Sequence, residues 1–169
     1  VIRGMGLDPR IGTNYMQPGP GFGGPCLEKD LAALIELGKF FELESTFMKA
    51  ILDRNERQVD LIRDKITKEI DSSGAIITIL GLAFKAGTDD IRNSASIKLI
   101  NMLLKDGHSV RSYDPVAKFK VANNKYCQFE DIYLASESAD CAIIMTEWEE
   151  FKSIDLNKLK DLMESNIIF

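Results

Sequence analysis

The sequence predicts an α/β protein in which a long helical region precedes a parallel sheet. Apolar residues recur at helical spacing through residues 31–70, with a break near residues 42–45. After the turn-forming residues 71–74, apolar strand-like runs alternate with helix-like segments. Strands that alternate with helices in this way favour a parallel sheet in a layered α/β fold.

The first half of the chain contains a loop-rich segment and two predicted helices. Residues 1–30 are rich in glycine and proline, whereas residues 31–41 and 46–70 carry apolar side chains at helical spacing. The apolar face of the second helix consists of Phe47, Ile51, Leu52, Val59, Ile62 and Ile66. Its opposite face is charged and favours contact with solvent. A helix this long either spans two domains or packs against a partner.

The second half is expected to supply the sheet and the helices that cover it. Strands are predicted at residues 75–84, 108–115 and 140–146, with a fourth opening at residues 166–169. Helices are predicted at residues 93–105, 129–136 and 155–164. Ligands of such sheets bind at the carboxyl ends of the strands, so the loops that follow the strands are the candidate binding segments.

Composition and charge exclude several classes of protein. The chain has 169 residues, 45% of them hydrophobic, which is ordinary for a globular protein. Its net charge of -5 is not offset by a basic cluster, which argues against a nucleic-acid surface. The longest apolar runs are far too short to span a membrane. Three cysteines and a single histidine, His108, match no zinc-binding spacing, so no metal site is predicted.

The cysteines and the two ends of the chain suggest a compartment and a fragment. Cys26, Cys127 and Cys141 cannot all pair with one another, so free thiols in a reducing, cytoplasmic compartment are expected. Cys141 lies in a buried-strand pattern and is expected in the core. The chain starts with Val1 and ends within an apparent strand, so we interpret it as a fragment of a longer protein.

The segment GFGGPCLEKD at residues 21–30 is the strongest functional candidate. Its glycines and proline predict an exposed, bendable loop that ends where a helix begins, next to Cys26. The positive end of the helix dipole and the nearby Lys29 both favour the thiolate, which is the nucleophilic form of cysteine. The alternative is that Cys26 is a small buried hydrophobic residue without chemistry.

The loop after the first predicted strand is a second candidate. The segment GLAFKAGTDDIRNS, residues 81–94, lacks the G-x-G-x-x-G pattern of dinucleotide-binding turns. It carries Lys85 and Arg92, which suit phosphate or carboxylate groups at the carboxyl end of a strand. The alternative is that both cations are held by Asp89 and Asp90.

Three separated stretches together resemble the UDP-glucose/GDP-mannose dehydrogenase family. They are RIGTNYMQPGPGFGGPCLEKD, ITILGLAFKAGTDDIRNSASI, and the SYDP and MTEWEEF segments, in this order and at this spacing. The resemblance extends from Gly4 to Phe169. Pro25 replaces a serine common in the family, and Leu27-Glu28 replaces a common Phe-Pro, whereas the cysteine and the Lys-Asp pair are retained.

The resemblance implies the central and carboxyl-terminal parts of a three-part enzyme. Residues 1–73 would form the cysteine loop and a central helical dimerisation domain, and residues 74–169 a truncated Rossmann-like domain that binds a UDP-sugar. The family's amino-terminal NAD-binding domain would be absent, and the long helix would form a homodimer. The family oxidises the C6 alcohol of a nucleotide sugar to a carboxylate by two hydride transfers to NAD, through a cysteine thiohemiacetal and a thioester.

The resemblance also assigns roles to individual residues. Cys26 matches the nucleophile, and Asp30 matches an aspartate that positions or activates water. Lys29 and Arg92 match residues that contact NAD. Asn55 and Gln58 are not matched to binding residues of the family and are interpreted as helix-interface residues. The implied substrate-binding residues are Tyr15, Met16, Gln17, Pro18, Gly19, Phe22, Gly23 and Lys85.

Several functions remain open on the sequence. UDP-glucose is the default substrate, with GDP-mannose and UDP-N-acetylhexosamines as alternatives within the family. A non-catalytic, dimerising nucleotide-binding module is a different class, although such a protein would be expected to lose Cys26 or Asp30. A thiol hydrolase would need a base beside Cys26, and nothing in the sequence places His108 there.

Overall fold

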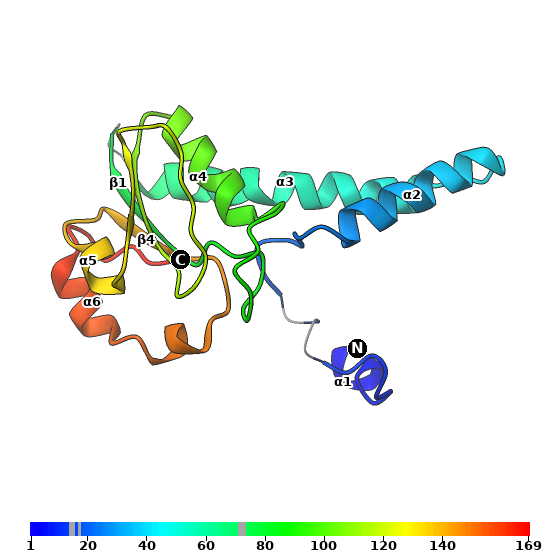
Figure 1. Ribbon diagram of the computed structural model, residues 1–169, viewed down its shortest axis with the longest axis horizontal. Coiled ribbons are helices and arrows are strands. Elements are labelled where there is room, and N and C mark those ends of the chain that lie inside the picture. Colours follow the sequence, from blue (N-terminus) through cyan, green and yellow to red (C-terminus); the bar gives the residue numbers. More distant parts are fainter. Residues whose placement is uncertain (14–15, 17, 71–73) are drawn as a thin grey trace.

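A computed structural model describes residues 1–13, 16, 18–70 and 74–169 (Figure 1). The predicted site residues Tyr15 and Gln17 therefore lie outside the described part. The helices are α1 (Ile2–Met5), α2 (Leu27–Phe40), α3 (Thr46–Glu69), α4 (Ala95–Lys105), α5 (Ile132–Ser136), α6 (Leu156–Leu162) and a short 3₁₀ helix, η1 (Glu149–Ser153). The strands are β1 (Ile76–Leu80), β2 (Ser109–Tyr113), β3 (Tyr126–Phe129) and β4 (Cys141–Ile144).

The four strands form one parallel sheet in the order β3-β2-β1-β4. From β1 the chain passes through α4 to β2 on one side, and from β3 it passes through α5 to β4 on the other side. The direction of winding therefore reverses between β1 and β4, where parallel sheets bind ligands at the carboxyl ends of their strands. The predicted α/β fold with a parallel sheet is confirmed.

Both faces of the sheet are covered by helices, which explains why its strands are apolar on both sides. On one face Ile77 and Ile79 join a core built with α4 and the end of α3. On the other face Ile76 packs toward α5 and α6, and the Thr78 hydroxyl donates a hydrogen bond of 2.7 Å to the Ala135 carbonyl. Figure 1 shows these helices on opposite sides of the sheet.

Helices α2 and α3 pack against each other and project away from the sheet as a helical hairpin (Figure 1). Val59 and Ile66, near the carboxyl end of α3, are buried in the same core as the sheet. That core therefore extends across the predicted domain boundary at residues 73 and 74, and the division itself stays a prediction. Within the described residues, no helix has the length and apolar character needed to cross a membrane.

The segment at residues 129–136 corrects one prediction. We expected a helix there, but Tyr126–Phe129 forms the edge strand β3 beside β2, and the helix begins only at Ile132. The Asp131 side chain caps that helix by accepting the amide hydrogens of Tyr133 and Leu134. At the end of the chain, the expected strand at 166–169 is represented by an isolated parallel bridge from Ile168 to Ala142.

Candidate nucleotide-sugar site

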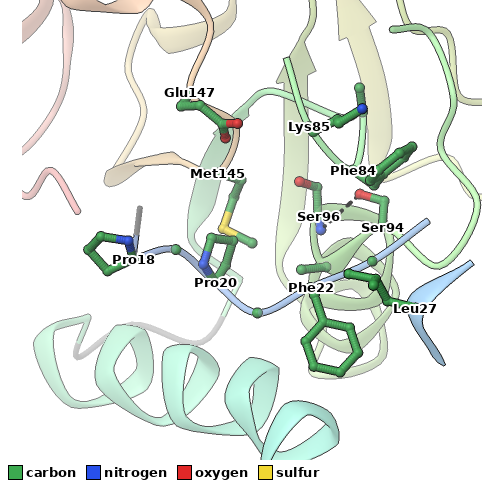
Figure 2. A pocket seen from close by; sticks show the side chains of 15 residues that line it. Pro18, Pro20, Phe22, Leu27, Phe84, Lys85, Ser94, Ser96, Met145 and Glu147 are labelled. Carbon is green, nitrogen blue, oxygen red and sulfur yellow. Dashed lines mark hydrogen bonds between the residues drawn. The ribbon is translucent and has the colours of Figure 1, made fainter. Parts of the chain in front are cut away.

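A cavity of about 430 Å³ lies at the point where the winding of the sheet reverses (Figure 2). Its walls come from the loop after β1, the first turn of α4, the segment after β4, and the proline- and glycine-rich segment before α2. Figure 2 shows Met145 and Glu147 entering from the β4 side and Ser94 and Ser96 from the start of α4. The position is the one at which a doubly covered parallel sheet binds its ligand.

The turn after β1 is fixed by close packing against the segment after β4. Gly81 has a φ of 95°, and a Cβ atom there would lie 2.5 Å from the Thr146 Cβ. The Thr146 hydroxyl donates a 2.8 Å hydrogen bond to the Ala83 carbonyl across this contact. Only glycine fits this backbone, so the two segments that frame the cavity are held together.

The carboxylate of Asp114, directly after β2, accepts hydrogen bonds from other groups of the protein. It is 2% exposed, and its Oδ2 accepts the amide hydrogens of Leu82 and Ala83 at 2.6 and 3.1 Å. The same oxygen accepts the Trp148 indole hydrogen at 3.1 Å, and Oδ1 accepts the amide hydrogens of Val116 and Ala117. In dinucleotide-binding folds, an acidic residue in this region binds the ribose, and the amide hydrogens of the first turn bind the pyrophosphate.

The turn after β1 therefore does not fit NAD. Its Leu82 and Ala83 amides are directed to Asp114, and the Gly81 amide donates to the Tyr113 carbonyl at 2.8 Å. The amide hydrogens of Gly81, Leu82 and Ala83 and the carboxylate of Asp114 are thus already occupied by hydrogen bonds within the protein. The ligand of this cavity must be recognised by other groups.

Two features that carry positive charge or partial positive charge, Lys85 and the first turn of α4, are suited to a phosphorylated ligand. Ser94 caps α4 by accepting the Ser96 amide hydrogen at 3.2 Å, and its hydroxyl donates to the Leu82 carbonyl at 2.6 Å. The first turn of α4, with its positive dipole end, therefore forms part of the wall. Lys85 lines the same cavity, with its Nζ 5.5 Å from the centre of the Phe84 ring.

The glycine-rich segment forms the opposite wall and brings in several predicted binding residues. Pro18, Gly19, Phe22 and Gly23 all line the cavity, together with Lys85. The ring of Phe22 points away from Met145 and Glu147 (Figure 2). Met16 is half-buried and lies outside the cavity lining. The structure thus brings together five of the predicted substrate-binding residues.

Cys26 lies where α2 begins, as predicted, but on the exposed side of the loop. It is the N-cap residue of α2, and its side chain makes no capping hydrogen bond. The thiol does not line the cavity, although Gly23 and Leu27 do. Asp30 lies one turn further along α2, and its exposed carboxylate is 3.4 Å from Lys29 Nζ. These three side chains face solvent beside the cavity.

Arg92 also lies outside the cavity, near the cysteine loop. Its carbonyl accepts the Gly24 amide hydrogen at 2.9 Å, and its exposed guanidinium donates to Asp90, with a shortest distance of 2.6 Å. These hydrogen bonds lower the pKa of the Asp90 carboxyl. Asp90 therefore holds the Arg92 guanidinium, which was the alternative interpretation of this cation. The pair is exposed, so a ligand can replace Asp90 as the partner of Arg92.

The other two cysteines differ sharply in environment. Cys127 is exposed on the edge strand β3, whereas Cys141 is completely buried on β4, as predicted. Burial raises the pKa of the Cys141 thiol to about 12, because the thiolate would lose its hydration. No group of three or more His, Cys, Asp or Glu side chains in the described ranges could hold a metal ion.

Sequence reasoning missed two residues. Asn55 bonds to the cysteine loop from α3, where helical spacing indicated only an interface residue. An asparagine side chain readily forms hydrogen bonds with backbone groups, so its presence inside a helix could have indicated a contact of this kind. Glu147 projects into the cavity just after β4; its place after a buried strand could have revealed it.

Comparison with known proteins agrees with this geometry. The UDP-binding domain of the UDP-glucose/GDP-mannose dehydrogenase family matches residues 78–169, and the central domain of the same family matches residues 1–57. The chain belongs to this family. The cavity lies between segments from these two matched regions.

Individual relatives support the assignment over nearly the whole chain. UDP-glucose 6-dehydrogenase from Rickettsia conorii is 37% identical over 174 residues, which cover 99% of this chain and 40% of the relative. The structure of a UDP-glucose dehydrogenase from Pyrobaculum islandicum matches with a TM-score of 0.81 and 30% identity, covering 99% of this chain and 41% of that one. That of a UDP-D-ManNAc dehydrogenase from Pyrococcus horikoshii matches with a TM-score of 0.76 and 31% identity, covering 99% and 38%.

The chain thus spans about 40% of the length of the curated relatives that it matches.

Proposed function

We propose that this chain is the cysteine-bearing and nucleotide-sugar-binding part of an NAD-dependent UDP-glucose 6-dehydrogenase. The observation that carries the proposal is the cavity between β1 and β4, whose far wall is the loop that leads to Cys26. Free cysteines fit a reducing, cytoplasmic compartment. The exposed apolar side chains of the α2–α3 hairpin fit a homodimer.

The cavity can orient a UDP-sugar by its charges. Lys85 and the first turn of α4 would bind the diphosphate, because both offer positive charge at the carboxyl end of β1. The glycine segment would lie along the sugar, where its small residues permit a close approach of the backbone. The C6 atom would then be directed toward the end of this segment and Cys26.

The chemistry of the cysteine follows from covalent capture of an aldehyde. Once C6 is at the aldehyde level, Cys26 Sγ forms a bond to it, and the carbonyl oxygen takes up a proton to give a thiohemiacetal. Loss of a hydride and a proton converts this adduct into a thioester. Water then attacks the thioester while Asp30 accepts one of its protons, and the C–S bond breaks to release the thiolate and a carboxylic acid, which loses its remaining proton to solvent to give the carboxylate.

The hydride acceptor, NAD, would be held by a part of the protein outside this chain, because the turn after β1 does not fit it. The exposed positions of Cys26, Lys29 and Arg92 suit contact with a cofactor that approaches from another domain. Lys29 and Arg92 are the proposed cofactor contacts. For Arg92 this contact would exchange with the exposed pair to Asp90.

Measurement of NADH formation by the whole protein that contains this chain tests the proposal. UDP-glucose, GDP-mannose and UDP-N-acetylglucosamine are supplied in turn, with Cys26→Ser beside the matched control Cys127→Ser. We expect two NADH per UDP-glucose, unchanged in the control and abolished or stalled in Cys26→Ser. If another donor alone is oxidised, the substrate assignment is wrong. A folded protein that binds NAD but oxidises none of them would be a non-catalytic binding module.

Binding of UDP to this chain tests the cavity by itself. Lys85→Gln should weaken UDP binding about 10-fold, the effect of losing one favourable charge contact of about 1.4 kcal/mol. Glu147→Gln should leave binding unchanged or strengthen it, because it removes a negative charge from the wall that receives the diphosphate. Titration calorimetry measures both. Equal effects of the two changes would contradict the placement of the diphosphate.

A further inference from the structure

Asn55 holds the backbone of the cysteine loop through a pair of hydrogen bonds. Its Oδ1 accepts the Phe22 amide hydrogen at 2.8 Å, and its Nδ2 donates to the Phe22 carbonyl at 2.8 Å. Thirty-three residues separate the two in sequence, so the contact joins the middle of α3 to the loop. A side-chain amide offers an acceptor and a donor side by side, so both polar groups of one residue's backbone are satisfied at once.

The loop is shaped to receive this amide. Gly21 has a φ of 113°, and a Cβ atom at this position would lie 2.7 Å from Asn55 Oδ1. Any other residue would therefore be strained and would also push the amide away. The glycine before Phe22 thus has a specific reason to be there, separate from general loop flexibility.

A second contact holds the other end of the loop. The Gly24 amide donates to the Arg92 carbonyl at 2.9 Å, and Asn93 Nδ2 donates to the Gly24 carbonyl at 3.3 Å. The backbone between Phe22 and Gly24 is therefore fastened to α3 on one side and to the segment before α4 on the other. Cys26 follows only two residues after Gly24, so its position depends on both attachments.

Asn55 is itself oriented by charged neighbours on two other helices. Its Nδ2 lies 3.4 Å from Glu28 Oε1 on α2, and the same oxygen lies 3.3 Å from Lys98 Nζ on α4. An acceptor on this side favours the rotamer in which Nδ2 faces Glu28 and the Phe22 carbonyl, and Oδ1 faces the Phe22 amide.

We propose that Asn55 is a positioning residue for catalysis, which holds the Phe22 peptide so that the glycine segment and Cys26 keep a fixed place beside the cavity. The proposal rests on the proposed function insofar as Cys26 is the nucleophile. A nucleophile that must meet one carbon atom is sensitive to small displacements, and a shift of about 1 Å can lower the rate about 100-fold. Asn55 does not line the candidate cavity, so in this proposal it acts through the loop.

Hydrogen exchange in this chain tests the contact without any assumption about activity. The variants are Asn55→Ala and the control Glu56→Gln, an exposed neighbour on the same helix. Asn55→Ala should speed exchange of the Phe22 amide at least about 10-fold, because its acceptor is lost. The Gly24 amide, bonded to Arg92, should change less. Unchanged exchange at Phe22 would overturn the proposal.

Kinetics of the whole protein then separate positioning from stability. Asn55→Ala should lower kcat by about 10- to 100-fold, with NAD binding unchanged and Glu56→Gln at the wild-type rate. Lower thermal stability with kcat per folded molecule unchanged would overturn the proposal. If the wild-type protein oxidises no nucleotide sugar, the proposed function fails, and the exchange experiment still decides whether Asn55 holds the loop.

Asn55→Asp adds a pH signature that a purely structural role would not give. The carboxylate can accept the Phe22 amide hydrogen, but it cannot donate to the Phe22 carbonyl, and Glu28 repels it. The protonated acid regains a donor. The kcat of this variant, divided by that of the wild type at the same pH, should therefore rise as the pH falls. A ratio that does not vary with pH would count against the paired hydrogen bond.

Discussion

The α/β unit (residues 74–169) and the helical arm (α2, the turn after it and the first half of α3) differ in how far their apolar side chains are buried. In the α/β unit, Ile77, Ile79 and Leu99 are completely buried. On α2 only Ile35 is buried, whereas seven large apolar side chains on α2, in the turn after it and at the start of α3 are exposed by about one half to four fifths. These exposed side chains are Leu27, Leu34, Leu37, Phe40, Phe41, Leu43 and Phe47.

This difference indicates that the two regions obtain their stability from different sources. The sheet and its helices bury a core within the chain, which is the usual requirement for independent folding. The arm leaves several large aromatic and aliphatic side chains in solvent, and exposed apolar surface of this kind favours binding to another protein. The cysteine loop lies where the regions meet, so its geometry depends on both.

Thiol labelling should give the largest contrast between the regions. Burial raises the pKa of Cys141 from an ordinary 9.0 to about 12, which lowers its thiolate fraction about 1,000-fold below pH 9. Cys26 and Cys127, both exposed, should react with iodoacetamide at pH 8, and Cys141 only after unfolding. Mass spectrometry of the digested chain reports each site. Rapid labelling of Cys141 in the folded chain would show that the α/β core is open.

Truncation of a leucine in each region should separate their contributions to folding. Leu99→Ala removes a completely buried side chain and should cost about 2–5 kcal/mol of unfolding free energy. Leu37→Ala, at a side chain that is 52% exposed, should change it by about 0.5 kcal/mol or less. Urea unfolding of the dilute chain measures both. Comparable losses would mean that the arm is as tightly packed as the sheet.

Measurement of self-association tests whether a second copy of the chain covers the exposed side chains of the arm. Phe40→Ser removes a ring that is 80% exposed and should weaken a homodimer about 30-fold, the effect of losing a contact of about 2 kcal/mol. Leu134→Ser, at an exposed leucine on α5, is the matched control and should have no effect. Sedimentation over a range of concentrations gives the dissociation constant. A wild-type chain that stays monomeric at high concentration would indicate a different partner for the arm.

The sequence predicted the elements that have strong local signals. The helices of the arm, the strands around Ile79 and Val110, and the helix near residues 155–164 were recoverable from apolar spacing. The strand at Tyr126–Phe129 was not, because a four-residue edge strand is defined by its pairing with β2 rather than by its own pattern. The site residues came mainly from the family resemblance.

The contacts that shape the site could not be predicted, because they join distant parts of the chain. Asp114 follows β2, and its hydrogen bonds to Leu82 and Ala83, 32 and 31 residues away in sequence, fix the turn after β1. Asn55 and Phe22 are separated by 33 residues, and no periodic pattern links them. Such pairs depend on how helices and loops meet in space, which local propensity does not determine.

The smallest expected effect concerns an ion pair between the second half of α3 and the α/β unit. Arg63 on α3 donates to Asp106, at the end of α4, at 2.5 and 2.7 Å. These hydrogen bonds lower the pKa of Asp106 below its ordinary 3.8. A carboxylate with a depressed folded-state pKa stabilises the fold above the unfolded-state pKa, and this contribution is lost as the pH falls through the folded-state value.

Asp106→Asn should therefore destabilise the chain at pH 7 by about 0.2–1 kcal/mol, the range for a largely exposed pair. Its difference from the wild type should shrink as the pH drops below about 4, because the wild-type carboxyl then becomes protonated as well. Asp161→Asn, at an exposed aspartate on α6, is the control. Urea unfolding at a series of pH values measures both variants. A difference that persists at low pH would mean that the effect of Asp106 does not depend on its charge. The second half of α3 would then be joined to the α/β unit by buried residues such as Val59 and Ile66 rather than by this pair.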